Sequence, residues 1–227
     1  MILGKYKTYN NKKANHYINV MGQTLARASD LPETFSGYHF LIQDSLEINA
    51  LAAPSGFIFV TRGILRCCEH EDAVAAILAH EIGHVQHQHG LQSIKKSRYK
   101  TALTTIGMEG VKQYGPGMLS SLTHAFEGFI TDITDTLFNT GYSRALEHDA
   151  DKAAVTILKR TGYDPNGLVA MLKTMKTKLK SDAQDFAKTH PSPESRIEDV
   201  QKLIGEYAKV KTPKARHARF KRALRKI

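Results

Sequence analysis

One short pattern constrains this chain more than any other: His-Glu-Ile-Gly-His at residues 80–84. Residues four apart lie on the same face of an α-helix, so His80 and His84 can reach one metal ion while Glu81 turns toward a metal-bound water. The preceding turns, 73–79, are apolar all round, which is typical of a buried, rigidly held helix. Zinc prefers such neutral nitrogen ligands in tetrahedral geometry with one position open. The pattern therefore predicts one Zn²⁺ ion on a buried helix.

The third zinc ligand is not supplied by the motif itself. The longer pattern, with glycine three residues after the second histidine and a third histidine three further on, is absent, since His87 and Gly90 occupy those positions. His87 can face the metal at helical spacing, but a solvated or supporting role is the favoured interpretation.

A second polar cluster, residues 143–151, offers the missing ligand. Glu147 and Asp151 are four apart and share a helix face, so Glu147 could complete a His-His-Glu site and Asp151 could orient a ligating histidine. The alternative is an ordinary acidic first helical turn stabilised by the helix dipole. His148 and Asp149 are competing ligands, and spacing alone leaves these alternatives open.

A third cluster, Thr-His-Pro-Ser-Pro-Glu-Ser-Arg at residues 189–196, has a structural explanation of its own. Ser192 and Pro193 suffice to start a helix, with serine as its cap and proline in the first turn. His190 and Arg196 are nevertheless suited to binding an oxyanion or a peptide carbonyl.

The hydrophobic pattern predicts a chain rich in helix with a small sheet near its start, an α+β fold that is predominantly α-helical. Short strands are expected in three segments that form a small antiparallel sheet. The motif helix is expected to run from Glu71 to His89, with Gly90 as its stop. The expected strands are 38–42, 48–52 and 57–61, and the other expected helices are 10–29, 91–113, 118–138, 143–160, 165–180 and 193–208.

Charge divides the chain into a nearly neutral body and a basic end. The formal net charge is +10, and nine Lys or Arg residues without an acid follow Glu206, which leaves the first 208 residues at about +1. We therefore predict one domain over residues 1–208 and a basic C-terminal tail over 209–227. A neutral body does not favour nucleic-acid binding. The tail has apolar residues at helical spacing, so it can dock on the body or rest on an anionic membrane surface.

Cysteine usage and hydropathy bear on the compartment. Cys67 and Cys68 are adjacent and have no other partner, so we expect two free, buried thiols. The N-terminus lacks the apolar core of a signal peptide, and no segment approaches the roughly 18 apolar residues of a membrane span. A soluble protein is expected.

Taken together, the three clusters resemble the gluzincin zinc metallopeptidases of the HtpX and BepA type, peptidase family M48. The resemblance covers residues 35–205, and it includes Asn-Ala-Leu-Ala-Ala-Pro-Ser-Gly at 49–56, Gly-Tyr-Asp-Pro at 162–165 and Thr-His-Pro at 189–191 in the expected order. It is closest to the soluble envelope branch, without the repeat domain of BepA. A zincin-type fold is implied. Ser55 departs from the usual Gly-Gly of the turn.

The resemblance implies a role for most of these residues. His80, His84 and Glu147 are implied as zinc ligands, Glu81 as the general base, and His190 as a fourth ligand or transition-state donor. Asp151 is implied to support one of the zinc ligands, and Arg196 is expected to lie beside these ligands without binding the metal. The strand that pairs with an extended substrate is implied at Asn49, Ala50, Leu51 and Ala52.

The function that these roles imply is zinc-dependent hydrolysis of peptide bonds in unfolded or misassembled envelope proteins. The expected partner is a polypeptide substrate, and the expected location is the periplasm or cell envelope, as a mature form without its signal sequence, with the cytoplasm also compatible. The alternative is a zinc-stabilised, chaperone-like binding protein with little turnover. An intact Glu81 argues against it, because a structural site needs no base.

Overall fold

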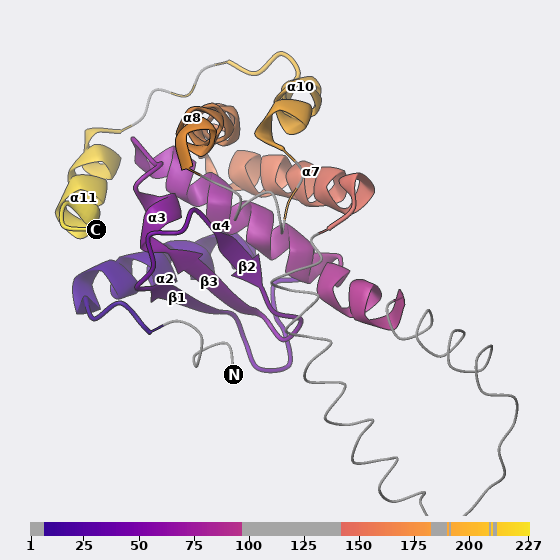
Figure 1. The fold of residues 1–227 in the computed structure, drawn as a ribbon, viewed down its shortest axis with the longest axis horizontal. Helices are drawn as coiled ribbons and strands as arrows, with labels where there is room; N and C mark the ends of the chain where they lie inside the picture. The colour runs from indigo at the N-terminus through magenta and orange to yellow at the C-terminus, as the bar shows by residue number, and fades with distance from the viewer. Residues whose placement is uncertain (1–6, 97–141, 183–189, 191, 209, 211–212) are drawn as a thin grey trace, which may run out of the picture.

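The computed structural model describes residues 7–96, 142–182, 190, 192–208, 210 and 213–227. Helix α4 runs through the middle of the molecule, with a three-stranded sheet and α2 on one side and a group of helices on the other (Figure 1). The architecture is α+β and predominantly helical, as the sequence predicts. The helices are α2 (Lys12–Arg27), α3 (Arg62–Leu65), α4 (Glu71–Gln86), α7 (Arg144–Thr161), α8 (Asn166–Asp182), α10 (Pro193–Ile204) and α11 (Lys214–Leu224).

The sheet is mixed, with strand order β1-β3-β2 for β1 (His39–Gln43), β2 (Ala50–Ala52) and β3 (Phe57–Thr61). Strands β2 and β3 are antiparallel, as expected, but β1 and β3 are parallel, which corrects the expectation of a wholly antiparallel sheet. The reason is the connection after β1, which carries the chain past the position of β3. A tight turn at Gly56, with φ +96°, then returns β3 between the other two strands.

Helix α4 is almost entirely buried, because its apolar residues cover its whole circumference. It packs against α7, α8, α2 and the sheet. The predicted continuation to His89 is wrong: α4 ends at Gln86, and a new helical segment covers residues 89–96. Gly90 therefore lies inside that second segment and does not stop α4. Residues 91–96 of the helix expected at 91–113 are helical, and the rest of that helix and the one expected at 118–138 lie outside the described residues.

The predicted helices after the motif agree closely with α7, α8 and α10. Helix α7 ends at Thr161 and is capped by Gly162, whose φ of +70° is the left-handed conformation that glycine adopts readily. Ser143 and Ser192 occupy N-cap positions, although neither side chain makes a capping hydrogen bond. Cys67 and Cys68 are free and buried, as predicted. None of the helices in the described ranges is long and apolar enough to cross a lipid bilayer.

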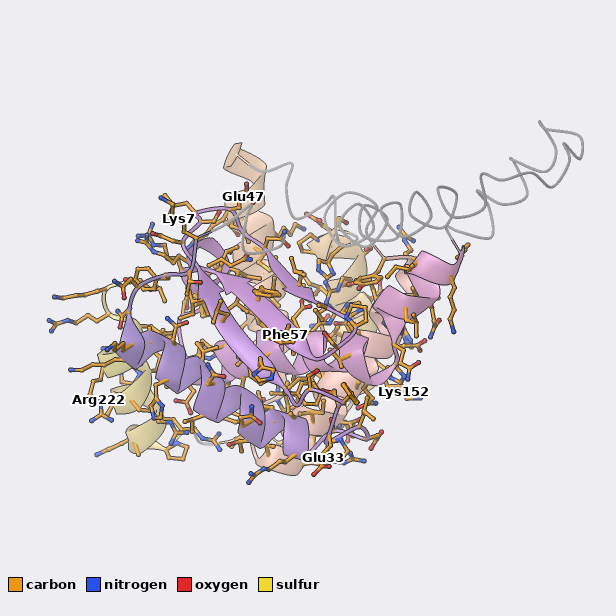
Figure 2. All side chains as sticks on the ribbon, turned by 90° about the horizontal axis from the view of Figure 1, so that it is seen from below. Lys7, Glu33, Glu47, Phe57, Lys152 and Arg222 are labelled. Atoms are coloured by element: carbon orange, nitrogen blue, oxygen red, sulfur yellow. The ribbon has the colours of Figure 1, made fainter. Side chains whose placement is uncertain are left out.

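The basic C-terminal segment forms helix α11, which packs alongside α2 and reaches the start of α4 (Figure 2). Two acids at that start, Glu71 and Asp72, are buried. The guanidinium of Arg219 pairs with both carboxylate oxygens of Glu71, and Arg216 lies 3.4 Å from Asp72. Tyr17 and Tyr163 also donate hydrogen bonds to Glu71, each over 3.1 Å. Part of the basic charge therefore neutralises buried acids at the N-terminus of α4.

Removing this arginine should destabilise the protein. In the Arg219→Ala variant, the buried carboxylate of Glu71 would lose its charged partner and keep, among the described residues, the two phenol donors, so we expect the free energy of unfolding to fall by about 1–3 kcal/mol. Urea unfolding followed by circular dichroism measures it. The control is Arg225→Ala, which removes an exposed charge at the C-cap of α11. It should change stability by less than about 0.5 kcal/mol. Equal stability of both variants would contradict a structural role for the Glu71–Arg219 pair.

Candidate metal centre

The centre is built where α4 crosses α7 at very short range. A methyl group on Gly83 would lie 2.8 Å from the backbone oxygen of Ala150 and 3.0 Å from its Cα. Only glycine therefore permits this approach, which places the His80 and His84 face of α4 directly opposite Glu147 on α7. The glycine inside the His-Glu-Ile-Gly-His pattern thus has a packing function of its own.

Four side chains that the sequence analysis singled out meet at this crossing: His80, His84, Glu147 and His190. Their ligand atoms all lie within 4.8 Å of one another, and all four residues are buried. His148 and His87, the competing candidates, are outside this group; the His148 side chain is 48% exposed. Asp149 on α7 is also exposed. The local spacing of α7 explains this, because Glu147 and Asp151 share the inward face and the two residues after Glu147 turn away.

The donor atoms of this group fit a tetrahedral zinc ion. Nε2 of His80 lies 3.1 Å from Nε2 of His84 and 3.5 Å from Oε2 of Glu147, and Nε2 of His84 lies 3.3 Å from Oε1 of Glu147. A tetrahedron with metal–ligand bonds of about 2.0–2.1 Å has edges of roughly 3.3–3.4 Å. Two imidazole nitrogens that face each other at this distance beside a carboxylate can bind the same cation. His80, His84 and Glu147 therefore form a donor set that suits zinc.

The outer nitrogen of His80 is held by a buried acid–arginine pair. Nδ1 of His80 lies 2.9 Å from Oδ1 of Asp151. Arg196 on α10 donates from Nε to Oδ2 of Asp151 over 3.0 Å and from Nη2 to Oδ1 over 2.6 Å. Its third nitrogen, Nη1, lies 3.1 Å from Oε2 of Glu147. All three guanidinium nitrogens thus face carboxylates, and Arg196 ties together the two acids that flank His80.

Burial and charge shift the ionisation of this network in opposite directions. Burial disfavours the protonated form of His80, but hydrogen bonds and charges from Asp151 and Glu147 outweigh it and raise the pKa to about 9. A histidine made so basic is a strong ligand. For His84, burial dominates and lowers the pKa to about 3, so its ring is neutral at physiological pH. Burial alone would raise the pKa of Glu147, yet His190 and Arg196 hold it well below its usual range.

Glu81 lies next to the ligands without joining them. It is buried on α4, and its Oε2 has no hydrogen-bond partner among the residues that the structure describes. Burial raises the pKa of its carboxyl, although the nearby His190 and His80 oppose that shift. His190 contacts the same site, with Nδ1 2.7 Å from Oε1 of Glu147.

Two residues at the centre were not identified from the sequence. His89 is 1% exposed, and its Nδ1 lies 2.9 Å from Nδ1 of His84. Tyr142 stacks on the His84 ring, with ring centroids 4.2 Å apart. The sequence prediction missed His89 because it assumed one unbroken helix, and in such a helix His89 would face away from His80 and His84. Tyr142 carries no local signal, since it precedes α7 and reaches His84 only in the folded chain.

The segment predicted to bind substrate lies beside α4. Strand β2 comprises Ala50, Leu51 and Ala52, is preceded by Asn49, and forms one edge of the sheet in contact with α4. The ladder bonds Thr61 N–H to Asn49 C=O and Ala53 N–H to Phe57 C=O fix its register. Because hydrogen-bonded and outward-facing positions alternate along an antiparallel strand, the amides of Ala50 and Ala52 point away from β3.

Comparison with known proteins assigns the chain to a family. The model of Peptidase family M48 matches residues 12–204, most of the chain. The chain belongs to peptidase family M48. This confirms the resemblance of the sequence to HtpX/BepA-type enzymes. The M48 match begins at the first residue of α2 and ends at the last residue of α10, so it includes every residue of the metal centre.

Several named relatives of this M48 protein are proteases. The beta-barrel assembly-enhancing protease of Escherichia coli K12 is 26% identical over 205 residues, which is 87% of this chain and 40% of that protein. The mitochondrial metalloendopeptidase OMA1 of Schizosaccharomyces pombe is 29% identical over 160 residues, 70% of this chain and 44% of that protein. The metalloprotease YcaL of Escherichia coli is 25% identical over 186 residues, 81% of this chain and 70% of that protein. The chain thus spans about two fifths of the first of these relatives.

Proposed function

We propose that this protein is a zinc-dependent endopeptidase whose zinc ligands are His80, His84 and Glu147. The observation that carries the proposal is the tetrahedral spacing of these three donors together with the adjacent Oε2 of Glu81, which has no hydrogen-bond partner in the described part of the chain. A purely structural zinc site would not need a buried carboxylate beside its ligands to act as a base. Membership of family M48 and the names of its protease relatives support the same activity.

The chain's own residues provide the acid–base chemistry. When bound in this site, zinc supplies Lewis acidity that activates water and polarises the scissile carbonyl. Glu81 accepts the proton of the attacking water at its carboxylate and passes it to the leaving amine. The raised pKa of the buried Glu81 carboxyl favours this shuttling role, because it moves the group toward neutral pH.

His190 and Arg196 have different roles in this proposal. His190, buried beside Glu147, donates a hydrogen bond to the developing oxyanion or serves as a fourth ligand. Arg196 is a positioning residue: its nitrogens already face Asp151 and Glu147, so it orients those acids and does not reach the substrate.

Replacing the general base should abolish turnover and leave the metal in place. For Glu81→Gln, we expect kcat for cleavage of casein to fall by about 10²–10⁴-fold, because a neutral amide cannot accept the water proton. Zinc content should stay at the wild-type level, since Glu81 is not a ligand. Glu33→Gln, an exposed acid on the surface (Figure 2), should retain full activity. Equal cleavage by wild type and Glu81→Gln would remove the peptidase claim and favour the chaperone-like alternative.

The substrate is proposed to lie extended along β2. Strand β2 is buried in this structure, so the outward amides of Ala50 and Ala52 would pair with a peptide backbone by strand addition once this edge is accessible, whereas pockets for particular side chains are not required. Recognition through the main chain gives low sequence selectivity and requires an extended segment. Unfolded or misassembled proteins of the cell envelope are therefore the proposed substrates, in agreement with the name of the first relative.

Main-chain recognition can be tested on the substrate, which avoids disturbing the strand. A cleavable peptide methylated at backbone nitrogens that face β2 should lose binding, because each methyl removes one ladder hydrogen bond. Methylation at the alternate nitrogens is the matched control. We expect KM to rise for one alternating set of positions only. Equal KM values for both sets would contradict pairing with β2.

The proposed location is the periplasm or cell envelope, with peripheral contact to an anionic membrane surface through α11. Several cations on this helix and just after it are exposed, and neither α2 nor α11 contains an acid. Each such cation near an anionic surface contributes about 1 kcal/mol at low salt.

In cell fractionation, the protein should sediment with envelope membranes and be released by about 1 M salt, which screens these charges. Recovery in the cytoplasmic fraction, or attachment that resists salt, would contradict this proposal.

A further inference from the structure

The chain changes direction immediately after α4 in a way that needs an explanation. Gln88 has φ +55° and is the one non-glycine residue in the described part of the chain with a positive φ. The left-handed conformation is unfavourable for an L-residue with a side chain. Its neighbours are well ordered by hydrogen bonds: His87 N–H donates to Gly83 C=O, and Gln88 N–H donates to Val85 C=O. A helical segment then resumes at residue 89. Such a conformation persists where the surrounding contacts compensate for it.

The break brings His89 back to the motif. In an unbroken helix, a residue five positions beyond His84 would lie about 140° around the helix axis and face away from it. With Gln88 left-handed, the imidazole of His89 meets that of His84 edge to face, with Nδ1 atoms 2.9 Å apart and ring planes at 74°. His87 stacks on the His89 ring at a centroid distance of 5.4 Å. Gly90 fits closely against Pro54 in the turn after β2.

The contact between His84 and His89 fixes where the protons lie. Two ring nitrogens form a hydrogen bond only if one carries a hydrogen and the other a lone pair. Nε2 of His84 faces Nε2 of His80 and the carboxylate of Glu147, so it must keep its lone pair to act as a ligand. A neutral His84 therefore carries its proton on Nδ1 and donates it to Nδ1 of His89.

We infer that His89 is a positioning residue that sets the tautomer and orientation of His84. This inference rests on the proposed zinc site. His89 accepts a hydrogen bond from Nδ1 of His84, just as Asp151 accepts one from Nδ1 of His80. The acceptor for His84 is a neutral imidazole, whereas the acceptor for His80 is a carboxylate. Tyr142 covers one face of the His84 ring, so stacking and the His89 hydrogen bond together leave the ring one direction in which to present Nε2. The left-handed Gln88 is the backbone feature that makes this contact geometrically accessible.

The inference is tested by two substitutions that differ in one property. His89→Asn keeps a hydrogen-bond acceptor close to the position of Nδ1, whereas His89→Leu fills a similar volume without one. Zinc affinity is measured by competition with a chromophoric chelator in the full chain. We expect His89→Leu to weaken zinc binding by about 10–100-fold, the usual effect of removing a group that orients a histidine ligand, and His89→Asn to restore most of that loss. The exposed His148→Leu on α7 is the matched control and should bind zinc as wild type does.

A spectroscopic readout separates orientation from simple packing. The Nδ1 proton of His84 should give a ring N–H resonance in ¹⁵N-edited NMR spectra of wild type and His89→Asn, and this resonance should be lost or shifted in His89→Leu. The test remains usable if His89→Leu folds poorly. In that case, the presence of the His84 Nδ1–H resonance in both wild type and His89→Asn decides the result. Unchanged zinc affinity in His89→Leu, equal defects in both variants, or a His84 proton on Nε2 would each overturn the inference. Neither measurement uses turnover, so failure of the peptidase proposal in the Glu81→Gln experiment would remain a separate result.

Discussion

The close crossing of α4 and α7 is the contact on which the rest of the centre depends. Gly83 has no room for a side chain against Ala150, and this missing methyl group lets two helices approach until their polar faces share one small volume. Both helices are otherwise apolar at this interface, so hydrophobic burial stabilises an arrangement that also encloses His80, His84 and Glu147. Position 83 of the motif therefore matters as much for geometry as the histidines matter for chemistry.

Buried carboxylates occur at both ends of α4, and arginines from the C-terminal third of the chain neutralise them. At the end beside the candidate metal centre, Arg196 of α10 binds Asp151 and faces Glu147, both of which are on α7. At the other end, Arg219 of α11 binds Glu71. A buried acid without such a partner would be costly, so α10 stabilises the two acids of α7, and α11 stabilises Glu71 of α4. The C-terminal helices are thus linked physically to the helix that carries the motif, although α11 lies far from the metal centre.

The sequence predicted most of what depends on local spacing. His80, His84 and Glu81 follow from helical periodicity, and the shared face of Glu147 and Asp151 follows from their four-residue separation. Spacing alone could not choose between Glu147 and its neighbours His148 and Asp149, because that choice depends on which face α7 turns toward α4. The family resemblance supplied the choice of Glu147. In the structure, Glu147 lies in the group of candidate metal ligands, whereas His148 and Asp149 do not.

What the sequence missed arises from long-range contacts or from an unusual backbone. The parallel pairing of β1 with β3 depends on where the connection crosses the sheet, which short-range alternation does not reveal. His89 was hidden because a left-handed glutamine is not expected in a pattern that otherwise continues as a helix. Docking of the basic tail on the body was one of the two expectations, but the sequence did not reveal the pairing of Arg219 with Glu71, which is 148 positions away.

The central claim is that His80, His84 and Glu147 hold one zinc ion, and an anomalous difference map at the zinc absorption edge tests it most directly. The account predicts a single peak bonded to Nε2 of both histidines and to the carboxylate of Glu147, at distances of about 2.0–2.2 Å. A crystal grown with zinc that shows no peak there, or a peak held by His87, His148 or Asp149 instead, would contradict the account.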